Sequence, residues 1–393
     1  MRRTGNGSGQ GTDRPIKPVM VDVARRNRIV VAMAIAFALF AAACTSSDSA
    51  TSPPEASTSQ EPESQGSSTT SNAPPASTPI VEPNPDLDPA GNPDLVDPGP
   101  PRSPLPRVDA DLEGALLGVS TGLTNAERNP RFLQLEADAG RQFDIGHVFH
   151  SWTTPIPTAD DLAHIDAGRI LMISWNGTDT IEIQQGAHDA WITQQAESVR
   201  DLGQPVLLRW LWEMDGNRRR AWVHSPEDFV AAWLQVRSIF DEVGATNAQF
   251  VWCPNEFLFW EGGDPDPWYP GDEHVDWLCA DGYNWADSTA SPEWVTADEI
   301  FGDFVDWAAP RNKPILIGET GSNEGEPGAK GQWLAELPEI LERDLPEVDA
   351  VVYFDKDFRE FGHNDWRVDT SESSYEGWLE LAADPWLNPL DRP

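Results

Sequence analysis

The amino-acid sequence predicts a (β/α)8 barrel over residues 109–393, preceded by a long segment that cannot form a core. From Gly114 onward, short apolar runs rich in β-formers alternate with amphipathic helical stretches, which is typical of βα units around a parallel sheet. Eight such runs follow one another, and a closed barrel of eight units needs roughly 250 residues. All 18 tryptophans lie between Trp152 and Trp386. An open doubly wound sheet fits the same alternation, but no Gly-rich phosphate-binding turn follows the first strand.

Each predicted strand is apolar along almost its whole length, as expected for a parallel strand that is covered on both faces. The predicted strands span residues 115–120, 143–149, 169–174, 205–210, 248–253, 275–282, 314–318 and 350–354. The clearest helices are predicted at residues 189–202, 226–243, 297–309 and 330–345. Ser225 and Asp228 resemble a capping box at the start of the second of these helices, and Gly244 stands where its C-terminus is expected.

Residues 1–43 are predicted to be a secretory signal, and residues 1–19 fit a misassigned start upstream of Met20. A basic stretch precedes fifteen apolar residues, fewer than the ~20 that a membrane-spanning helix needs. Three alanines then precede Cys44, as in a bacterial lipoprotein signal in which Cys44 becomes the lipidated first residue. An ordinary signal peptide cleaved near Ala43 is the alternative. We therefore expect an exported protein, either anchored through Cys44 at the outer face of the membrane or secreted.

Residues 44–108 are predicted to be a disordered acidic linker rich in Ser, Thr and Pro. Residues 45–106 contain no aromatic residue and 15 of the 35 prolines, so they cannot bury enough apolar surface to offset the entropy of ordering. The chain has a formal net charge of −38, which argues against nucleic-acid binding because phosphate contacts need clustered Lys and Arg. A neutral polysaccharide is compatible with such a surface. Nothing in the sequence favours oligomerisation, so we expect a monomer.

Polar and aromatic side chains gather where the predicted strands end, which is where the active sites of (β/α)8 barrels lie. Glu213 follows the fourth predicted strand and Glu319 the seventh, and these strand ends face each other in a closed barrel. A carboxylate beside a buried apolar strand is unfavourable unless it is solvated or paired. Glycoside hydrolysis uses two carboxyl groups, one as proton donor and one at the anomeric carbon. Desolvation by Trp212 could raise the pKa of Glu213 for the first role.

Four segments resemble glycoside hydrolase family 26, the β-mannanase family of a large clan of (β/α)8 hydrolases. They are RWLWEMDG at 209–216 with Trp222, YPGDEHVDWLCADGY at 269–283, IGETG at 317–321 and DWR at 365–367. The segments occur in the family's order. The resemblance implies a retaining endo-β-glycanase that acts on a polysaccharide, with β-1,4-mannan as the first candidate and mixed-linkage β-glucan or xylan as alternatives.

The resemblance also implies roles for individual residues. Glu213 would be the acid/base, Glu319 the nucleophile, Tyr283 a donor that orients the nucleophile, and Arg209 a support for the carboxylates. Further candidates for substrate contacts are Trp175, Trp212, Trp222, Asn255 and Trp285. Trp212 stands where the family has a histidine that helps hold the sugar in mannanases, and Asp215 stands where the family has an asparagine. These two departures leave the substrate class open.

A non-catalytic lipoprotein that binds polysaccharide is the alternative from another functional class, although a binder has no need for two glutamates. No zinc-protease motif, nucleophile elbow or phosphate loop is present, so we expect no metal and no cofactor. His147 and His150 face opposite sides of a strand, which makes a shared metal ion unfavourable. Cys253 and Cys279 are predicted on neighbouring strands, where they could form a disulfide or remain two buried thiols.

Overall fold

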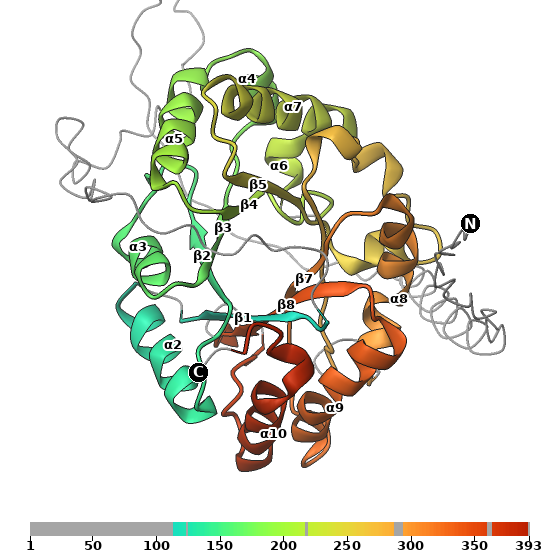
Figure 1. Ribbon diagram of the computed structural model, residues 1–393. Coiled ribbons are helices and arrows are strands. Elements are labelled where there is room, and N and C mark those ends of the chain that lie inside the picture. Colours follow the sequence, from blue (N-terminus) through green and yellow to red (C-terminus); the bar gives the residue numbers. More distant parts are fainter. Residues whose placement is uncertain (1–112, 123–124, 217–218, 287–293, 360–363, 392–393) are drawn as a thin grey trace, which may run out of the picture. The chain divides into compact units, whose positions relative to one another are not determined.

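Eight parallel strands close into a barrel in the order of the sequence, with β1 paired to β8 (Figure 1). The computed structural model describes residues 113–122, 125–216, 219–286, 294–359 and 364–391. The predicted (β/α)8 barrel is confirmed, and the open-sheet alternative is excluded by the β1–β8 ladder. The predicted signal segment, the linker and Cys44 lie outside the described residues.

The strands follow the predicted ranges to within about two residues at each end. They are β1 (Leu116–Thr121), β2 (Ile145–His150), β3 (Ile170–Trp175), β4 (Val206–Trp210), β5 (Ala248–Trp252), β6 (Trp277–Asp281), β7 (Ile315–Thr320) and β8 (Val348–Asp355). One boundary matters for function: β7 extends to Thr320, so Glu319 lies within the strand and not after it.

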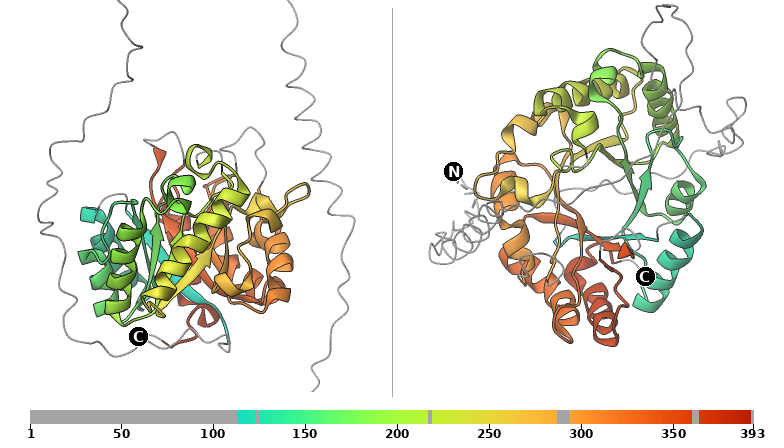
Figure 2. Two further views of the ribbon diagram at one scale, coloured as in Figure 1. Left: turned by 90° about the horizontal axis from the view of Figure 1, so that it is seen from above. Right: turned by 180° about the vertical axis from the view of Figure 1, so that it is seen from behind.

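The helices lie outside the ring of strands, as both views in Figure 2 show. They are α2 (Asn125–Ala139), α3 (Ala159–Asp166), α4 (Thr180–Gln184), α5 (Asp189–Leu202), α6 (Arg220–Val223), α7 (Pro226–Glu242), α8 (Ala297–Ala308), α9 (Ala329–Asp344) and α10 (Glu372–Ala383). The Ser225 side chain accepts a hydrogen bond from the Asp228 amide at the start of α7. Gly244 has φ 73° just beyond the end of α7, a conformation that favours glycine.

Side chains alternate along each strand between the barrel interior and the outside, where the helices pack. The lower layers of the interior are apolar and include Leu116, Ile145, Ile170, Met172, Leu207, Val251, Trp277, Leu316, Ala350 and Val352. Closer to the carboxyl ends, the same faces carry polar groups. Ser174 lies two residues after Met172, and Arg209 lies two residues after Leu207. The alternation therefore places a layer of polar side chains above the apolar interior of the barrel.

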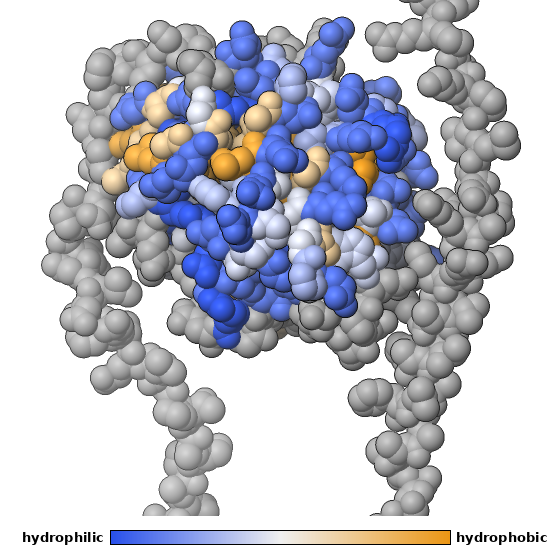
Figure 3. Space-filling model, turned by 90° about the horizontal axis from the view of Figure 1, so that it is seen from below, coloured by the Kyte–Doolittle hydropathy of each residue, from blue (hydrophilic) through white to orange (hydrophobic). Residues whose placement is uncertain are grey.

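The surface of the barrel is hydrophilic over most of the face drawn in Figure 3, where hydrophobic residues form only small groups. Within the described part of the chain, no helix has both the length and the apolar character needed to cross a membrane.

Candidate active site

The two predicted glutamates meet at the mouth of the barrel. Glu213 follows β4, and Glu319 is a buried residue of β7. Oxygen atoms from Glu213, Glu319 and Asp281 all lie within 4.8 Å of one another. The pairing of β6 with β7 changes register between Ala280 and Asp281, which brings Asp281 opposite Glu319. A register change of this kind re-aims side chains at a strand end, and here it turns two carboxylates toward the same space.

Glu319 is held by two hydrogen-bond donors. The hydroxyl of Tyr283 donates to Oε2 at 2.6 Å, and Nη2 of Arg209 donates to Oε1. Burial and the charge of Glu319 raise the pKa of Tyr283 well above its ordinary value, so that the phenol keeps the proton it donates. Both contacts direct one carboxylate toward the mouth, as a nucleophile requires.

Arg209 is fully buried and joins several strands beneath the carboxylates. Its Nη1 lies 2.6 Å from both oxygens of Asp281, and its Nε donates to the Ser174 hydroxyl at 2.6 Å. That hydroxyl is also 2.6 Å from Nε2 of His147. Burial lowers the pKa of His147 well below its ordinary value, and the charge of Arg209 adds to this shift. His147 is therefore a neutral hydrogen-bonding partner that helps to hold the arginine in place.

Glu213 lies in a different environment. Its backbone has φ 51°, and its amide donates to the Cys253 carbonyl at 2.8 Å. Burial raises the pKa of the Glu213 carboxyl to about 7; Glu319 and Asp215 add to the shift, and Arg219 and Arg209 oppose it. A carboxyl group with this pKa is protonated below neutral pH and can donate its proton, as a general acid must.

Two further acids lie behind Glu213. Oδ1 of Asp215 accepts hydrogen bonds from the amide and side chain of Asn255 at 3.1 and 3.0 Å, and burial raises the pKa of Asp215 to about 6. Glu256 is buried at the start of a 3-10 turn, where burial, together with the charges of Glu213 and Asp215, raises its pKa to about 8. The predicted contact residue Asn255 thus supports Asp215 through two hydrogen bonds.

Aromatic rings line the mouth on both sides of the carboxylates. The ring of Trp212 lies close to the guanidinium groups of Arg209 and Arg219, whose Cζ atoms are 5.1 and 4.4 Å from its centroid. On the other side, Tyr283 packs against Trp366 with centroids 4.6 Å apart. Trp285 is 37% exposed and meets the Trp366 ring edge to face at 5.1 Å. Flat rings of this kind can stack on the apolar faces of sugars.

The other two predicted tryptophans differ. Trp222 is half-buried in α6, and Arg219 lies over its ring, 5.6 Å from the centroid. Trp175 has no exposed surface and stacks on Trp152 with centroids 4.6 Å apart. The expectation that Trp175 contacts substrate is wrong. Because Ser174 points into the barrel, its neighbour Trp175 points outward toward the helices.

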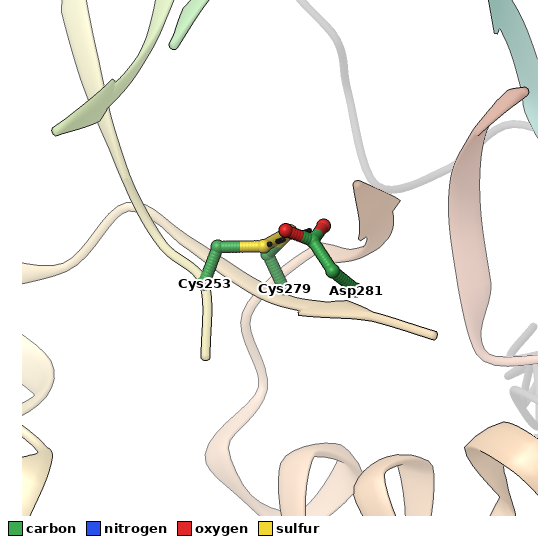
Figure 4. Close-up of side chains that lie close together, drawn as sticks. All are labelled: Cys253, Cys279 and Asp281. Atoms are coloured by element: carbon green, nitrogen blue, oxygen red, sulfur yellow. Dashed lines mark hydrogen bonds between the residues drawn. A yellow bond between two sulfur atoms is a disulfide. The ribbon is translucent and has the colours of Figure 1, made fainter. Parts of the chain in front are cut away.

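Cys253 and Cys279 form a disulfide directly below the carboxylates, which settles the question that the sequence left open. Figure 4 shows the Asp281 side chain beside this bond, with Oδ1 3.3 Å from Sγ of Cys253. The pairs Val251–Trp277 and Trp252–Leu278 join β5 to β6, and the disulfide continues this ladder one step further. It links the strand whose end anchors Glu213 to the strand that carries Asp281.

Two groups of described residues have the spacing of metal ligands. In the group of Cys253, Cys279 and Asp281, the sulfur atoms are bonded to each other. In the group of Glu213, Asp281 and Glu319, Arg209 already forms ion pairs with Asp281 and Glu319. His147 and His150 contact separate partners, Ser174 and Asp161.

The sequence did not single out several residues that the structure places at the site. They are Phe149, Ser174, Glu256, Asp281, Lys356 and Trp366. His147, which the sequence analysis considered together with His150, also lies at the site. A usable signal existed for two of the others, because Ser174 and Asp281 lie at inward-facing positions near the ends of predicted strands, where a polar side chain adds nothing to apolar packing.

Comparisons with known proteins agree with this geometry. The model of glycosyl hydrolase family 26 matches residues 172–304, a segment that includes Glu213 and Tyr283 and ends before Glu319. Endoglucanase H of Acetivibrio thermocellus is 32% identical over 263 residues, which cover 64% of this chain and 28% of that protein. The barrel is a glycoside hydrolase domain. The match and the relative together support family 26.

Two further similarities concern a smaller part of the sequence or the fold alone. A β-1,3-xylanase of Alcaligenes sp is 28% identical to this chain over 152 residues, which cover 38% of this chain and 30% of that protein. The catalytic domain of the Bacillus sp. JAMB-750 GH26 endo-β-1,4-mannanase superposes with a TM-score of 0.54 at 16% identity, covering 70% of this chain and 88% of that chain. The chain spans less than a third of the length of the two curated relatives.

Proposed function

We propose that this chain is a retaining endo-β-glycanase that cleaves a β-linked polysaccharide by double displacement. The observation that carries the proposal is the close approach of Glu213 and Glu319, whose nearest oxygens are within 4.8 Å. Retaining enzymes hold their two carboxyl groups about 5–5.5 Å apart, whereas inverting enzymes separate them by about 6.5–9.5 Å to admit a water molecule. The short separation favours the retaining route.

The proposed reaction has two steps. In the first, a Glu319 oxygen forms a bond to the anomeric carbon while the bond to the leaving oxygen breaks and Glu213 gives that oxygen its proton. In the second, Glu213 takes a proton from water, the water oxygen attacks the same carbon, and the bond to Glu319 breaks. Tyr283 and Arg209 orient the Glu319 carboxylate through the contacts described above.

For the substrate we propose a β-glucan ahead of β-1,4-mannan, which reverses the order that the family resemblance suggests. Trp212 replaces the family's sugar-binding histidine, and the guanidinium groups of Arg209 and Arg219 lie near its ring. An indole presents a flat apolar face where the histidine would present a hydrogen-bonding nitrogen. The 32% identical relative is named an endoglucanase, which favours the same order.

The test is the release of reducing sugar from mixed-linkage β-glucan, β-mannan, β-1,3-xylan and β-1,4-xylan. Wild type should act on one or more of them, and Glu319→Ala should lose at least about 10³-fold in kcat. Glu326→Ala, an exposed acid in the loop after β7, is the matched control and should retain activity. The first product should keep the β configuration when its anomeric proton is followed by NMR. A product of α configuration, or no release from any of the four, contradicts the proposal.

The non-catalytic alternative makes a different prediction in the same experiment. A pure binder would be retarded by one of these polysaccharides in affinity electrophoresis and would release no sugar from it. Glu319→Ala would change neither result.

We also propose that the chain is exported and anchored through a lipid on Cys44. The support is the sequence alone: a basic stretch, an apolar run and three alanines before the cysteine. Metabolic labelling with a radioactive fatty acid should mark the wild type and not Cys44→Ser. Equal labelling of both chains, or of neither, contradicts the anchor.

A further inference from the structure

Lys356 is a buried cation at the mouth of the barrel that the two-step reaction does not use. It comes directly after β8, two residues beyond Phe354, and only 5% of it is exposed. Burying a lysine is unfavourable unless its ammonium group gains partners, so a buried lysine in a catalytic mouth indicates a role.

The ammonium group of Lys356 lies over two aromatic rings. Nζ is 3.8 Å from the centroid of Phe149 and 4.8 Å from that of Phe354. The Phe149 ring meets Trp212 edge to face at 5.3 Å, and the Phe354 ring meets Tyr283 at 5.9 Å. Lys356 therefore lies among aromatic rings that connect Trp212, next to Glu213 in the sequence, with Tyr283, whose hydroxyl donates to Glu319.

Among the described residues, the ammonium group of Lys356 has no hydrogen-bond acceptor. An ammonium group has three N–H donors, and contact with a ring face satisfies them only in part. Across the described ranges of the chain, no oxygen accepts a hydrogen bond from its Nζ. Lys330 is the instructive contrast: it is also buried, but its Nζ donates to the Arg367 carbonyl at 2.6 Å and to the Thr370 hydroxyl at 3.0 Å.

We propose that Lys356 donates a hydrogen bond to a hydroxyl oxygen of the sugar whose anomeric carbon faces Glu319, and that this contact determines which sugar the enzyme accepts. The inference rests on the proposed function, because it assigns the acceptor to the substrate of that reaction. Neutral hydroxyl groups suit the site better than a sugar carboxylate. A further negative charge would lie beside Glu213, Glu319 and Asp281, whose oxygens are already within 4.8 Å of one another.

The charges around Lys356 are compatible with this role. Burial lowers the pKa of Lys356 to about 7; the carboxylates of Glu319 and Asp355 oppose the shift, while Arg128 and Arg209 add to it. The ammonium group therefore carries its charge below neutral pH, the range in which Glu213 holds its proton. A donor hydrogen bond from a charged group to a substrate hydroxyl strongly favours a sugar that presents that hydroxyl over one that lacks it.

The test measures oligosaccharide binding separately from hydrolysis. In a Glu319→Ala background, the dissociation constants of a mixed-linkage glucan hexasaccharide, mannohexaose and xylohexaose are measured by calorimetry with and without Lys356→Met. We expect the constant for the best ligand to rise roughly 10- to 100-fold on loss of Lys356, the usual range for a hydrogen bond to a charged group. The loss should be unequal among the three sugars.

Lys330→Met in the same background is the matched control. It removes a second buried lysine whose donors are satisfied within the protein, so it should lower the thermal unfolding midpoint and leave the dissociation constants within twofold. Lys356→Gln provides a second variant if Lys356→Met unfolds, since the amide keeps a donor without the charge and should give an intermediate loss.

The outcomes separate this inference from the proposed function. If wild type hydrolyses a polysaccharide but both Lys356 variants bind the oligosaccharides as tightly as their background, the inference is wrong and the proposed function stands. If binding depends on Lys356 but wild type hydrolyses nothing, the hydrogen bond to a sugar hydroxyl stands, while the proposed function and the role of this contact in it are wrong. An equal loss of affinity for all three sugars that Lys330→Met reproduces would show a structural effect and would also overturn the inference.

Discussion

The two carboxyl groups of the site lie close together but in opposite environments. Glu319 belongs to a strand, is buried, and accepts hydrogen bonds from Tyr283 and Arg209. Glu213 lies on a turn with positive φ, next to the acids Asp215 and Glu256. One side of the mouth is rich in donors, and the other is rich in like charges and apolar rings.

This difference shows how one barrel can hold two identical side chains in two environments. The donors aimed at Glu319 hold its carboxyl group in one orientation, which is what a nucleophile needs. Burial and neighbouring acids raise the pKa of Glu213 to about 7, which is what a proton donor needs. The division does not follow the strands: Tyr283 follows β6, whereas Arg209 reaches Glu319 from β4, the strand that ends shortly before Glu213.

Replacing each glutamate by alanine is the largest perturbation of this contrast. Glu213→Ala should lower kcat for polysaccharide by about 10²- to 10⁴-fold, the usual contribution of a general acid. On an aryl β-glycoside with a good leaving group, added azide should restore turnover of Glu213→Ala with a β-glycosyl azide as product. Glu319→Ala should instead give an α-glycosyl azide. Azides of the same configuration from both variants would mean that the two glutamates do not have distinct roles.

Arg209→Met should remove the cation that pairs with Asp281 and Glu319 on the donor-rich side of the site. It leaves Asp281 and Glu319 buried without their cation, and removing one partner of a buried ion pair costs about 3–5 kcal/mol of the free energy of unfolding. Urea denaturation measures this loss. Arg343→Met removes exposed ion pairs with Glu339 and Asp344 and should leave the free energy of unfolding nearly unchanged. Similar free energies of unfolding for the two variants would show that the buried ion pairs of Arg209 do not stabilise the protein.

Gly318→Ala tests how tightly the nucleophile is packed against the floor of the site. A Cβ at Gly318 would lie 2.4 Å from Sγ of Cys279 and 2.7 Å from Oδ1 of Asp281, so neighbouring atoms must shift. Overpacking of this kind costs about 1–3 kcal/mol, and displacement of Asp281 should lower kcat as well. Gly302→Ala in α8 is the control, since its Cβ would meet nothing within 4 Å and alanine favours a helix. Equal unfolding free energies for the two variants would refute the tight packing.

The smallest effect is expected in the pH dependence of the acid-rich side. As pH rises through the pKa of Glu213, the acid loses its proton, so kcat/KM should fall on the alkaline side near pH 7. Asp215→Asn removes a negative charge that raises this pKa and should move the alkaline limb to lower pH. Arg219→Gln removes a positive charge that lowers it and should move the limb to higher pH. Shifts in the same direction would show that charge is not the cause.

Much of the fold followed from the sequence because apolar runs covered on both faces leave a strong pattern. The strands matched to within about two residues, and the helix over Asp189–Leu202 matched at both ends. The site was harder to predict. The motifs identify Glu213, Glu319, Arg209 and Tyr283. Trp175 lies outside them, and its outward direction follows only from the alternation of side chains along β3.

The remaining site residues depend on closure of the barrel. Lys356 follows β8 and Phe149 belongs to β2, and no spacing along the chain indicates that Nζ lies over that ring. The register change that sets Asp281 opposite Glu319 likewise arises from the pairing of two strands. Such features come from how strands align around the ring, which a single sequence does not encode locally.

The disulfide beneath the carboxylates makes assembly of the site depend on the redox state of the compartment in which the chain folds. Both sulfur atoms are buried, so oxidants reach them while the strands are still coming together. A reducing cytosol keeps thiols apart, and an oxidising exterior joins them. Protein made in a reducing host would contain two thiols below Asp281, and its active site would lack the disulfide. Oxidation during folding is therefore a step in building the active site, and production outside a reducing cytosol is the appropriate condition for measuring its activity.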